Sequence, residues 1–411
     1  MVNVAIMGHG VVGSGVAEIL INYRDRVSEK AKNDINVKYI LDLRDFDGLS
    51  YSDKFIKDFN VILNDPEVQV VVEVMGGCTF AYDYVKACLL AGKSVCSSNK
   101  ELVAQKGAEL LKIASDKNVN FLFEASVGGG IPVLRPMAQC LTANEITEVT
   151  GILNGTTNFI LTKMVSENMD FADALKLAQE LGYAEKDPTA DIEGLDACRK
   201  ICILASLGFG RHVYPEQVKA EGITKISSLD VETADAHGYV IKLIGKTRKL
   251  DNGQITAAVY PALVSKSNML SGVNDVFNAI MVRGDEVGDV MFYGRGAGKF
   301  PTASAVVGDV IDCVKHLAAR KYLFWEDGTE DYVADPMSDI TKLYIRCEVY
   351  GDNILGALNE AENIFKTKNI ISDKDGKYIS FITEFDIEEK LREDIKNLTL
   401  SKPVSIIHAI D

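Results

Sequence analysis

The sequence has 411 residues, of which 47% are hydrophobic, and its formal net charge is −15. This length is enough for two or three domains with sizeable cores. The negative charge argues against binding to nucleic acid or to an anionic membrane surface, and no apolar run is long enough to cross a bilayer. Since no secretory signal pattern is visible, we expect a cytoplasmic protein. The eight cysteines form no CxxC pair, which favours reduced core thiols over a zinc site.

The first element expected is a strand over residues 2–7, followed by a glycine loop and an amphipathic helix to about Lys30. Strand, GxGxxG loop and helix in this order are typical of dinucleotide binding, because the glycines let the backbone approach a pyrophosphate at the helix N-terminus. This context favours a cofactor site strongly over a plain structural turn. The residues predicted to contact the cofactor are Gly8, Gly10, Val11, Val12 and Gly13.

The next strand, residues 37–41, ends in Asp42, and Arg44 follows closely. An acid at this position usually binds the ribose hydroxyls of NAD, whereas an arginine just beyond it can bind the 2′-phosphate of NADP. Because the sequence offers both side chains, the preference between NAD and NADP stays open.

Further strands, at 69–75, 93–96 and 120–123, alternate with helices, which predicts a Rossmann-type doubly wound parallel sheet. Lys100 follows the strand at 93–96, in the place where such sheets bind ligands. The alternative is a solvated lysine in the first turn of a helix. A cation there opposes the helix dipole, so a functional role is favoured.

Three consecutive glycines, 128–130, follow Glu124. Exposed carbonyls beside a carboxylate could hold a hard cation through oxygen ligands. The alternative, slightly favoured by sequence alone, is a flexible turn where the chain leaves the first domain.

Beyond this point the pattern changes to an expected α+β domain. A strand at 146–153 ends in residues 154–158, whose side chains would cap a helix, and an acidic stretch at 185–193 precedes another helix. On that helix Asp196 and Lys200 are four residues apart and share one face. They form either a solvent-exposed ion pair at the edge of the helix or a polar pair that faces a cavity. Carboxylates gathered near a lysine would bind a substrate ammonium and leave the lysine to move a proton.

The remainder is expected to form a largely antiparallel sheet and a small C-terminal module. A helix and a strand occupy 229–250, a hairpin turn lies at 251–253, and strands near 255–264 and 277–283 are expected to pair with 287–293. A glycine loop at 294–298 leads into a helix that would return to the first domain. After a polar linker at 329–338, the order βαββαβ predicts a ferredoxin-like module.

Together these pieces resemble homoserine dehydrogenase over about residues 1–320. The C-terminal module resembles an ACT domain, although Asp352-Asn353 stands where such domains usually carry a glycine, which predicts a weak response to threonine. The segments that carry the resemblance are GHGVVG at 8–13, SSNKELVA at 97–104, EASVGGGIP at 124–132, GILNGTTNFIL at 151–161, GYAEKDPTADIEGLDACRK at 182–200 and YGRGAGKFPTASAVVGD at 293–309.

The resemblance implies an NAD(P)-dependent interconversion of L-aspartate 4-semialdehyde and L-homoserine, in the biosynthesis of threonine, methionine and isoleucine. It assigns proton transfer and carbonyl polarisation to Lys200 and Lys100. The substrate-binding set is Glu185, Asp196, Gly182 and Asp191. Further cofactor contacts are Gly77, Thr79, Lys100 and Gly298. A sodium-type cation would be bound by Glu124 with the carbonyls of Val127, Gly129 and Ile131.

The domains expected on this basis are a cofactor domain at 1–133 completed by a helix at 301–320, a catalytic and dimerisation domain at 134–300, and an ACT-like regulatory domain at 335–411. A homodimer or higher homo-oligomer is expected, through the strand at 146–153. Two alternatives remain: a related NAD(P)-dependent oxidoreductase acting on another amino-acid-like substrate, or an NAD(P)-binding amino acid sensor.

Overall fold

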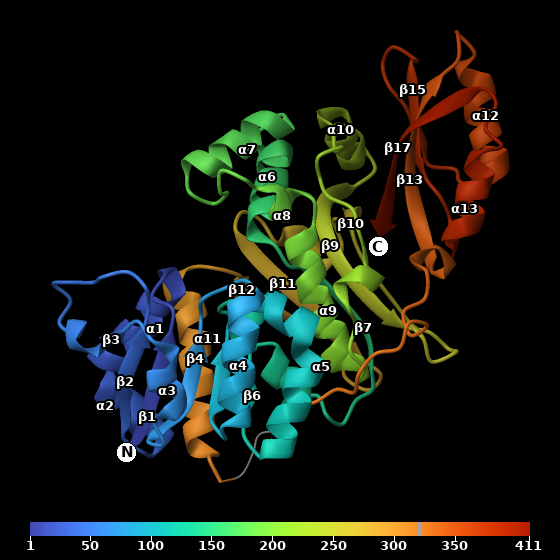
Figure 1. The fold of residues 1–411 in the computed structure, drawn as a ribbon. Coiled ribbons are helices and arrows are strands. Elements are labelled where there is room, and N and C mark those ends of the chain that lie inside the picture. Colours follow the sequence, from blue (N-terminus) through green and yellow to red (C-terminus); the bar gives the residue numbers. More distant parts are fainter. Residues whose placement is uncertain (319–322) are drawn as a thin grey trace. The chain divides into compact units, whose positions relative to one another are not determined.

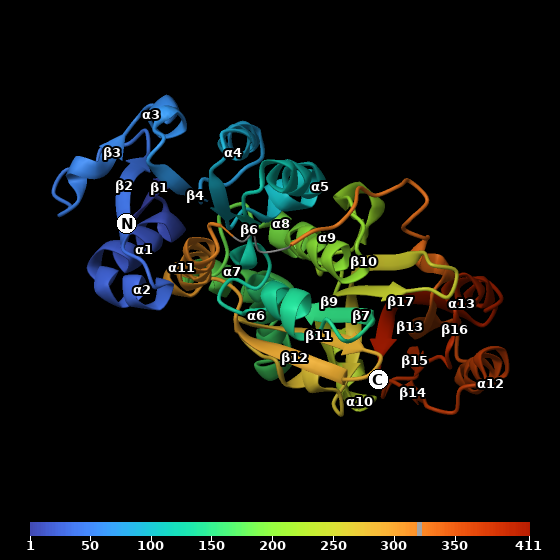
Figure 2. The same cartoon turned by 90° about the horizontal axis from the view of Figure 1, so that it is seen from below.

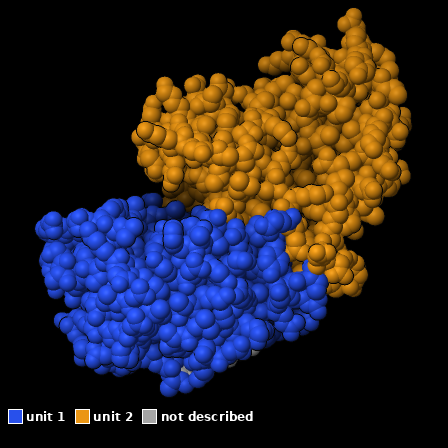
Figure 3. Space-filling model, in the orientation of Figure 1, with its two compact units in different colours: residues 1–149, 202–216, 280–329 blue, residues 150–201, 217–279, 330–411 orange. Residues whose placement is uncertain are grey.

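The computed structural model describes residues 1–318 and 323–411 (Figure 1). The chain divides into two compact units (Figure 3). Unit 1 comprises residues 1–149, 202–216 and 280–329, and unit 2 comprises 150–201, 217–279 and 330–411. The three-domain division stays a prediction, and the last two residues of the helix expected at 301–320 lie outside the described residues.

Unit 1 contains a six-stranded sheet of order β3-β2-β1-β4-β5-β6, in which every neighbouring pair is parallel. Strands β1 and β5 are buried along their whole length, as expected for strands of a parallel sheet that is covered on both faces. The strand order reverses between β1 and β4, which is where doubly wound sheets bind ligands. The strands are β1 (Val2–Met7), β2 (Ile35–Leu41), β3 (Phe55–Ile56), β4 (Val68–Glu73), β5 (Ser94–Ser97) and β6 (Phe121–Leu122). The predicted fold class is confirmed.

Helices alternate with these strands: α1 (Val11–Asn22), α2 (Arg24–Ala31), α3 (Phe59–Asn64), α4 (Thr79–Leu90) and α5 (Lys100–Lys117). The single helix expected to reach Lys30 is wrong, because the chain breaks at Tyr23 between α1 and α2. The returning helix is confirmed as α11 (Lys299–Lys315), which packs beside α1 (Figure 2). Its buried side chains, including Ala303 and Val306, join the core beneath β1.

The middle of the chain supplies helices α6 (Gly155–Ser166), α7 (Phe171–Glu180), α8 (Thr189–Ile192), α9 (Leu195–Phe209) and α10 (Ser228–Ala236). Its strands are β7 (Ile146–Ile152), β8 (Lys219–Ala220), β9 (Tyr239–Lys249), β10 (Ile255–Ser265), β11 (Phe277–Gly284) and β12 (Gly288–Arg295). The hairpin turn is confirmed: β9 and β10 pair antiparallel over eleven residue pairs, and Gly253 in the turn has φ 85°.

The pairing expected for residues 255–264 is wrong. Strand β12 lies beside β11, whereas β10 lies between β9 and β17 (Ser401–Ile410) and also pairs with β8. Sequence could not reveal the contact between β10 and β17, because β17 comes from the far end of the chain.

The C-terminal module has the predicted order βαββαβ, with one extra two-residue strand. Its elements are β13 (Ile340–Val349), α12 (Ile354–Phe365), β14 (Ile370–Ser372), β15 (Tyr378–Ile382), β16 (Asp386–Ile387), α13 (Glu388–Ile395) and β17. The sheet order β17-β13-β15-β14 encloses a separate core against α12 and α13. That the module is an ACT domain stays a prediction. The segment before it is fixed in place, since Ala334 N donates to Ile255 O at 2.8 Å. Within the described ranges, no helix is long and apolar enough to cross a membrane.

Candidate active site

The glycine loop between β1 and α1 has the shape of an anion cradle. Gly8 has φ 99°, and a Cβ built on Gly13 would lie 2.0 Å from Gly8 O, so the third glycine allows α1 to close against the loop. A Cβ built on Gly10 meets nothing within 4 Å. Gly10 is the N-cap of α1 and offers no side-chain cap, which leaves the first N–H groups of the helix to an incoming ligand.

Asp42 and Arg44 lie at the end of β2 and interact with each other. Asp42 Oδ2 accepts a hydrogen bond from His9 N at 2.8 Å, which ties the carboxylate to the glycine loop. Arg44 Nε donates to Asp42 Oδ1 at 3.0 Å and Arg44 Nη2 donates to Oδ2 at 2.9 Å. The Arg44 guanidinium holds the pKa of Asp42 well below its usual range. The carboxylate is therefore ionised, and the guanidinium beside it is 61% exposed, so solvent weakens this ion pair.

A buried carboxylate that sequence reasoning missed organises the loop after β4. Glu73 is fully buried, and its Oε1 accepts hydrogen bonds from Met75 N at 2.9 Å and Gly76 N at 3.3 Å. Its Oε2 accepts a hydrogen bond from Ser97 Oγ at 2.6 Å, across the ends of β4 and β5. Burial raises the pKa of Glu73, and these hydrogen bonds oppose that rise. The available signal was a charged residue inside an otherwise apolar run.

Asn99 continues this network toward Lys100. Asn99 Nδ2 donates to Gly77 O at 2.6 Å, and Asn99 Oδ1 accepts a hydrogen bond from Leu102 N at 3.0 Å as the N-cap of α5. Lys100 is the first residue of α5, and Thr79 is the first residue of α4. The loop that carries Gly77 and the start of the lysine-bearing helix are therefore held together in unit 1.

The Glu124 carboxylate accepts hydrogen bonds from three consecutive backbone N–H groups further along the chain. Its Oε1 accepts hydrogen bonds from Val133 N at 2.6 Å and Leu134 N at 2.8 Å, and its Oε2 accepts one from Arg135 N at 2.8 Å. These three bonds explain why a carboxylate is buried here. The cation predicted at Glu124, Val127, Gly129 and Ile131 stays a prediction.

The three glycines after Glu124 allow a close approach between two loops. A Cβ built on Gly129 would lie 2.2 Å from Gly296 O, and Gly130 N donates to Arg295 O at 3.1 Å. The flexible-turn alternative is therefore wrong, because the glycines are required by packing. The facing loop ends at Gly298, the N-cap of α11, which has φ 119°.

In unit 2, Asp196 and Lys200 form a buried ion pair on α9. Lys200 Nζ lies 2.7 Å from Asp196 Oδ2 and donates to Leu153 O at 2.7 Å. The lysine and aspartate side chains are 9% and 4% exposed, so the alternative of a solvent-exposed ion pair is wrong. Lys200 Nζ is therefore enclosed by a carboxylate and a backbone carbonyl.

Asn154 joins this pair to a second predicted residue. Asn154 Nδ2 donates to Asp196 Oδ2 at 2.9 Å and to Asp191 Oδ1 at 2.7 Å, while Asn154 Oδ1 accepts a hydrogen bond from Thr157 N at 2.8 Å. The helix cap was predicted, but the bridge between the two carboxylates was not. The structure thus brings Asp191, Asp196 and Lys200 into one polar cluster.

Gly182 and Glu185 lie on the segment that links α7 to α8. Gly182 has φ 75° just beyond the end of α7, a conformation that glycine adopts without strain. Thr156 Oγ1 donates to Tyr183 O at 2.7 Å, which ties this segment to the start of α6. The Glu185 side chain is exposed and free to meet a ligand from solvent.

A second buried lysine of unit 2 has a structural role. Lys242 Nζ donates to Asn158 Oδ1 at 3.1 Å, Val273 O at 2.5 Å and Asn274 Oδ1 at 3.1 Å, so β9 holds the loop before β11. Desolvation lowers the pKa of Lys242 to about 8.

This pKa predicts a pH-dependent contribution to stability. Between pH 8 and 10.5 the folded protein binds fewer protons at Lys242 than the unfolded chain, so stability rises with pH in that window. The free energy of unfolding of the wild type, relative to Lys242→Met, should rise by up to about 3 kcal/mol from pH 7.5 to 10.5. Urea unfolding of both proteins measures it, with the exposed Lys249→Met as control. Parallel pH curves would show that Lys242 is not desolvated.

The parallel sheet, the glycine loop and the acid after β2 define the class of dinucleotide-binding α/β proteins, to which NAD(P)-dependent oxidoreductases belong. A family model described as homoserine dehydrogenase, NAD binding domain, matches residues 8–124, and one described as homoserine dehydrogenase matches residues 132–311. The chain is 38% identical over 379 residues to the homoserine dehydrogenase of Bacillus subtilis, covering 91% of this chain and 87% of that protein.

Solved structures of homoserine dehydrogenases are also similar to this chain. The homoserine dehydrogenase of Thiobacillus denitrificans superposes with a TM-score of 0.90 at 33% identity and covers 100% of this chain and 98% of its own. A hyperthermophilic archaeal homoserine dehydrogenase in complex with NADPH superposes with a TM-score of 0.64 at 29% identity and covers 76% of this chain and 97% of its own. The chain belongs to the homoserine dehydrogenase family.

Proposed function

We propose that the chain catalyses the NAD(P)-dependent interconversion of L-aspartate 4-semialdehyde and L-homoserine, with Lys200 as the proton donor in the reducing direction. The observation that supports this most directly is the buried contact of Lys200 Nζ with Asp196 Oδ2 at 2.7 Å in a chain of this family. A bound NAD(P)H supplies the hydride for the aldehyde carbon. Lys200 gives its proton to the carbonyl oxygen, which becomes the hydroxyl of homoserine, and Asp196 stabilises the ammonium beforehand.

The residues of the glycine loop and of β2 fit either dinucleotide. Asp42 is ionised and oriented by His9 N, which suits ribose hydroxyls, and Arg44 is exposed beside it, which suits a 2′-phosphate. We therefore propose that both NAD and NADP bind, with Arg44 leaving Asp42 when a 2′-phosphate is present. The archaeal relative in complex with NADPH supports the binding of NADP.

The experiment that tests the function is the oxidation of L-homoserine, followed by the absorbance of the reduced cofactor with NAD and with NADP. Turnover of homoserine supports the proposal. A related oxidoreductase would reduce its cofactor only with another amino-acid-like substrate, and an amino acid sensor would bind the cofactor without turnover. Either result would overturn it.

Glu185 is proposed to bind the ammonium group of the substrate from the α7–α8 segment. Glu185→Gln should raise the KM for homoserine about tenfold while kcat changes little, since a hydrogen bond to a charged group contributes roughly 1.5 kcal/mol. Steady-state kinetics at saturating cofactor measure the change. Glu180→Gln, an exposed glutamate at the end of α7, is the matched control and should leave KM unchanged. An unchanged KM for Glu185→Gln would assign Glu185 no part in binding.

A further inference from the structure

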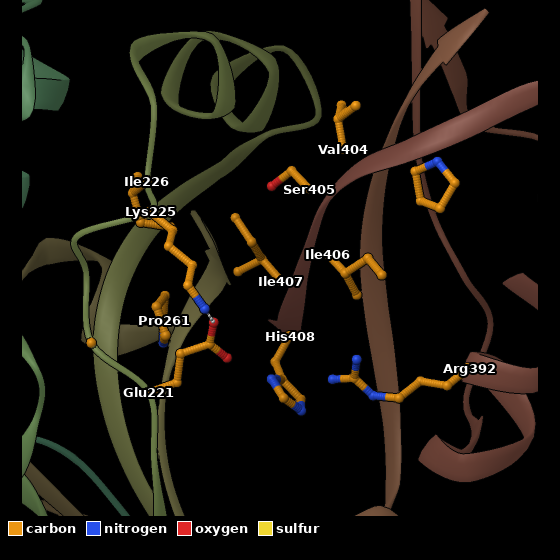
Figure 4. Close-up of a pocket in the computed structure, with 12 residues that line it drawn as sticks. Glu221, Lys225, Ile226, Pro261, Arg392, Val404, Ser405, Ile406, Ile407 and His408 are labelled. Atoms are coloured by element: carbon orange, nitrogen blue, oxygen red, sulfur yellow. Dashed lines mark ion pairs between the residues drawn. The ribbon is translucent and has the colours of Figure 1, made fainter.

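The sheet of unit 2 forks between β10 and β17. These strands pair only where Ala262–Val264 of β10 meet His408–Ile410 of β17. Toward the start of β10 the short strand β8 takes the neighbouring place, and Glu221 N donates to Val259 O at 2.8 Å. Strand β17 meanwhile stays paired with β13. A cavity of about 300 Å³ lies in the fork (Figure 4).

One wall of this cavity carries the guanidinium of Arg392, which a buried carboxylate outside the cavity holds in place. Arg392 Nε donates to Glu388 Oε1 at 2.7 Å, and Glu388 Oε2 lies 3.0 Å from His408 Nε2. Glu388 is 4% exposed and does not itself line the cavity. The His408 ring also stacks on Tyr260, with 3.8 Å between ring centroids. A guanidinium has five N–H donors, so the donors that Glu388 does not use remain for a ligand. Figure 4 shows the guanidinium directed toward the interior of the cavity, beside His408.

The opposite wall carries Lys225 and Glu221, and aliphatic side chains lie between the two walls. Lys225 and Glu221 are 3.6 Å apart with side chains 82% and 50% exposed, so their ion pair is weak and easily exchanged. Among the described residues that line the cavity, Glu221 is the only carboxylate, against the cations Arg392 and Lys225. The N–H donors of Arg392 that Glu388 does not use, and the easily exchanged ammonium of Lys225, suit a ligand that carries an anionic group.

We propose that this cavity binds a small aliphatic carboxylate. The carboxylate accepts hydrogen bonds from Arg392, in the planar geometry that guanidinium groups favour. The aliphatic body covers Ile226 on one side and Ile406 of β17 on the other. If the ligand also carries an amino group, Glu221 is placed to accept its hydrogen bonds. The site shares no residue with the Asp191–Asp196–Lys200 cluster or with Asp352-Asn353.

The test is ligand-detected saturation-transfer NMR on the full chain, with sodium pentanoate and, separately, L-norvaline. For molecules of this size we expect dissociation constants on the order of millimolar. Arg392→Gln should weaken binding about tenfold or more, as expected for losing a hydrogen bond between charged groups. Lys390→Gln on the same helix is the control, because Lys390 is exposed, pairs with Asp386 and does not line the cavity.

A second variant keeps the test decisive if Arg392→Gln folds poorly. Val404 is 43% exposed on β17 and lines the cavity, so Val404→Glu adds a repelling charge without removing a partner. It should also weaken binding about tenfold. Tighter binding of norvaline than of pentanoate, lost in Glu221→Gln, would support an amino acid as the ligand; equal binding would support a simple carboxylate. Wild-type binding of both probes by the Arg392 or Val404 variant, or no binding by the wild type, would overturn the proposal. No turnover is measured, so failure here leaves the proposed reaction untouched.

Discussion

Lys200→Met is expected to lower kcat at least about a hundredfold, the usual scale for losing a general acid. Methionine keeps the aliphatic length of the side chain but cannot donate the proton that the carbonyl oxygen needs. The ammonium of Lys200 is buried, at 2.7 Å from both Asp196 Oδ2 and Leu153 O, so solvent cannot easily replace it. Because the interaction serves the transition state, kcat and kcat/KM should fall together. Steady-state kinetics in both directions measure the effect.

Lys242→Met is the matched control, since Lys242 is also a buried lysine of unit 2 and binds only protein groups in the contacts described above. It should change the free energy of unfolding and its pH dependence, with kcat within about threefold of the wild type. Circular dichroism would show whether either variant loses its fold. A Lys200→Met enzyme with nearly normal kcat would remove Lys200 from the chemistry.

The parts of the structure that sequence predicted are those set by local patterns. The apolar runs of β1 and β4, the glycine loop after β1 and the alternation of strands with helices predicted the parallel sheet. The βαββαβ order of residues 340–410 could also be predicted, because each element has its own hydrophobic periodicity. The spacing of Asp196 and Lys200 on α9 placed them on one face before their contact was seen.

The contacts that the sequence did not predict join segments that are far apart along the chain and that the fold brings together. Glu73 and Ser97 end two strands that only the sheet makes adjacent, and Asn154 reaches Asp191 and Asp196 from more than thirty residues away. Gly129 is a glycine because Gly296 O lies where its side chain would be. Such contacts join segments with no shared local pattern, so no periodicity reports them.

Gly13→Ala is expected to disrupt the cofactor loop itself. The new Cβ would lie 2.0 Å from Gly8 O and 2.9 Å from Gly8 C, and these backbone atoms cannot move unless β1 or α1 moves with them. We expect the free energy of unfolding to fall by at least about 3 kcal/mol, at the upper end of overpacking effects. We also expect no measurable cofactor binding. Thermal unfolding and a titration of NADPH fluorescence measure the two effects.

Gly10→Ala separates binding from folding. Gly10 has φ −76°, which alanine adopts freely, and its built Cβ meets nothing within 4 Å. The apparent Tm should therefore match the wild type. The methyl group would nevertheless occupy the surface where a pyrophosphate approaches the N-terminus of α1, so affinity for NADPH should fall at least about tenfold, as for one lost hydrogen bond to a charged group. Wild-type affinity in Gly10→Ala would place the phosphates elsewhere, and a wild-type Tm in Gly13→Ala would show that α1 can shift away from the loop.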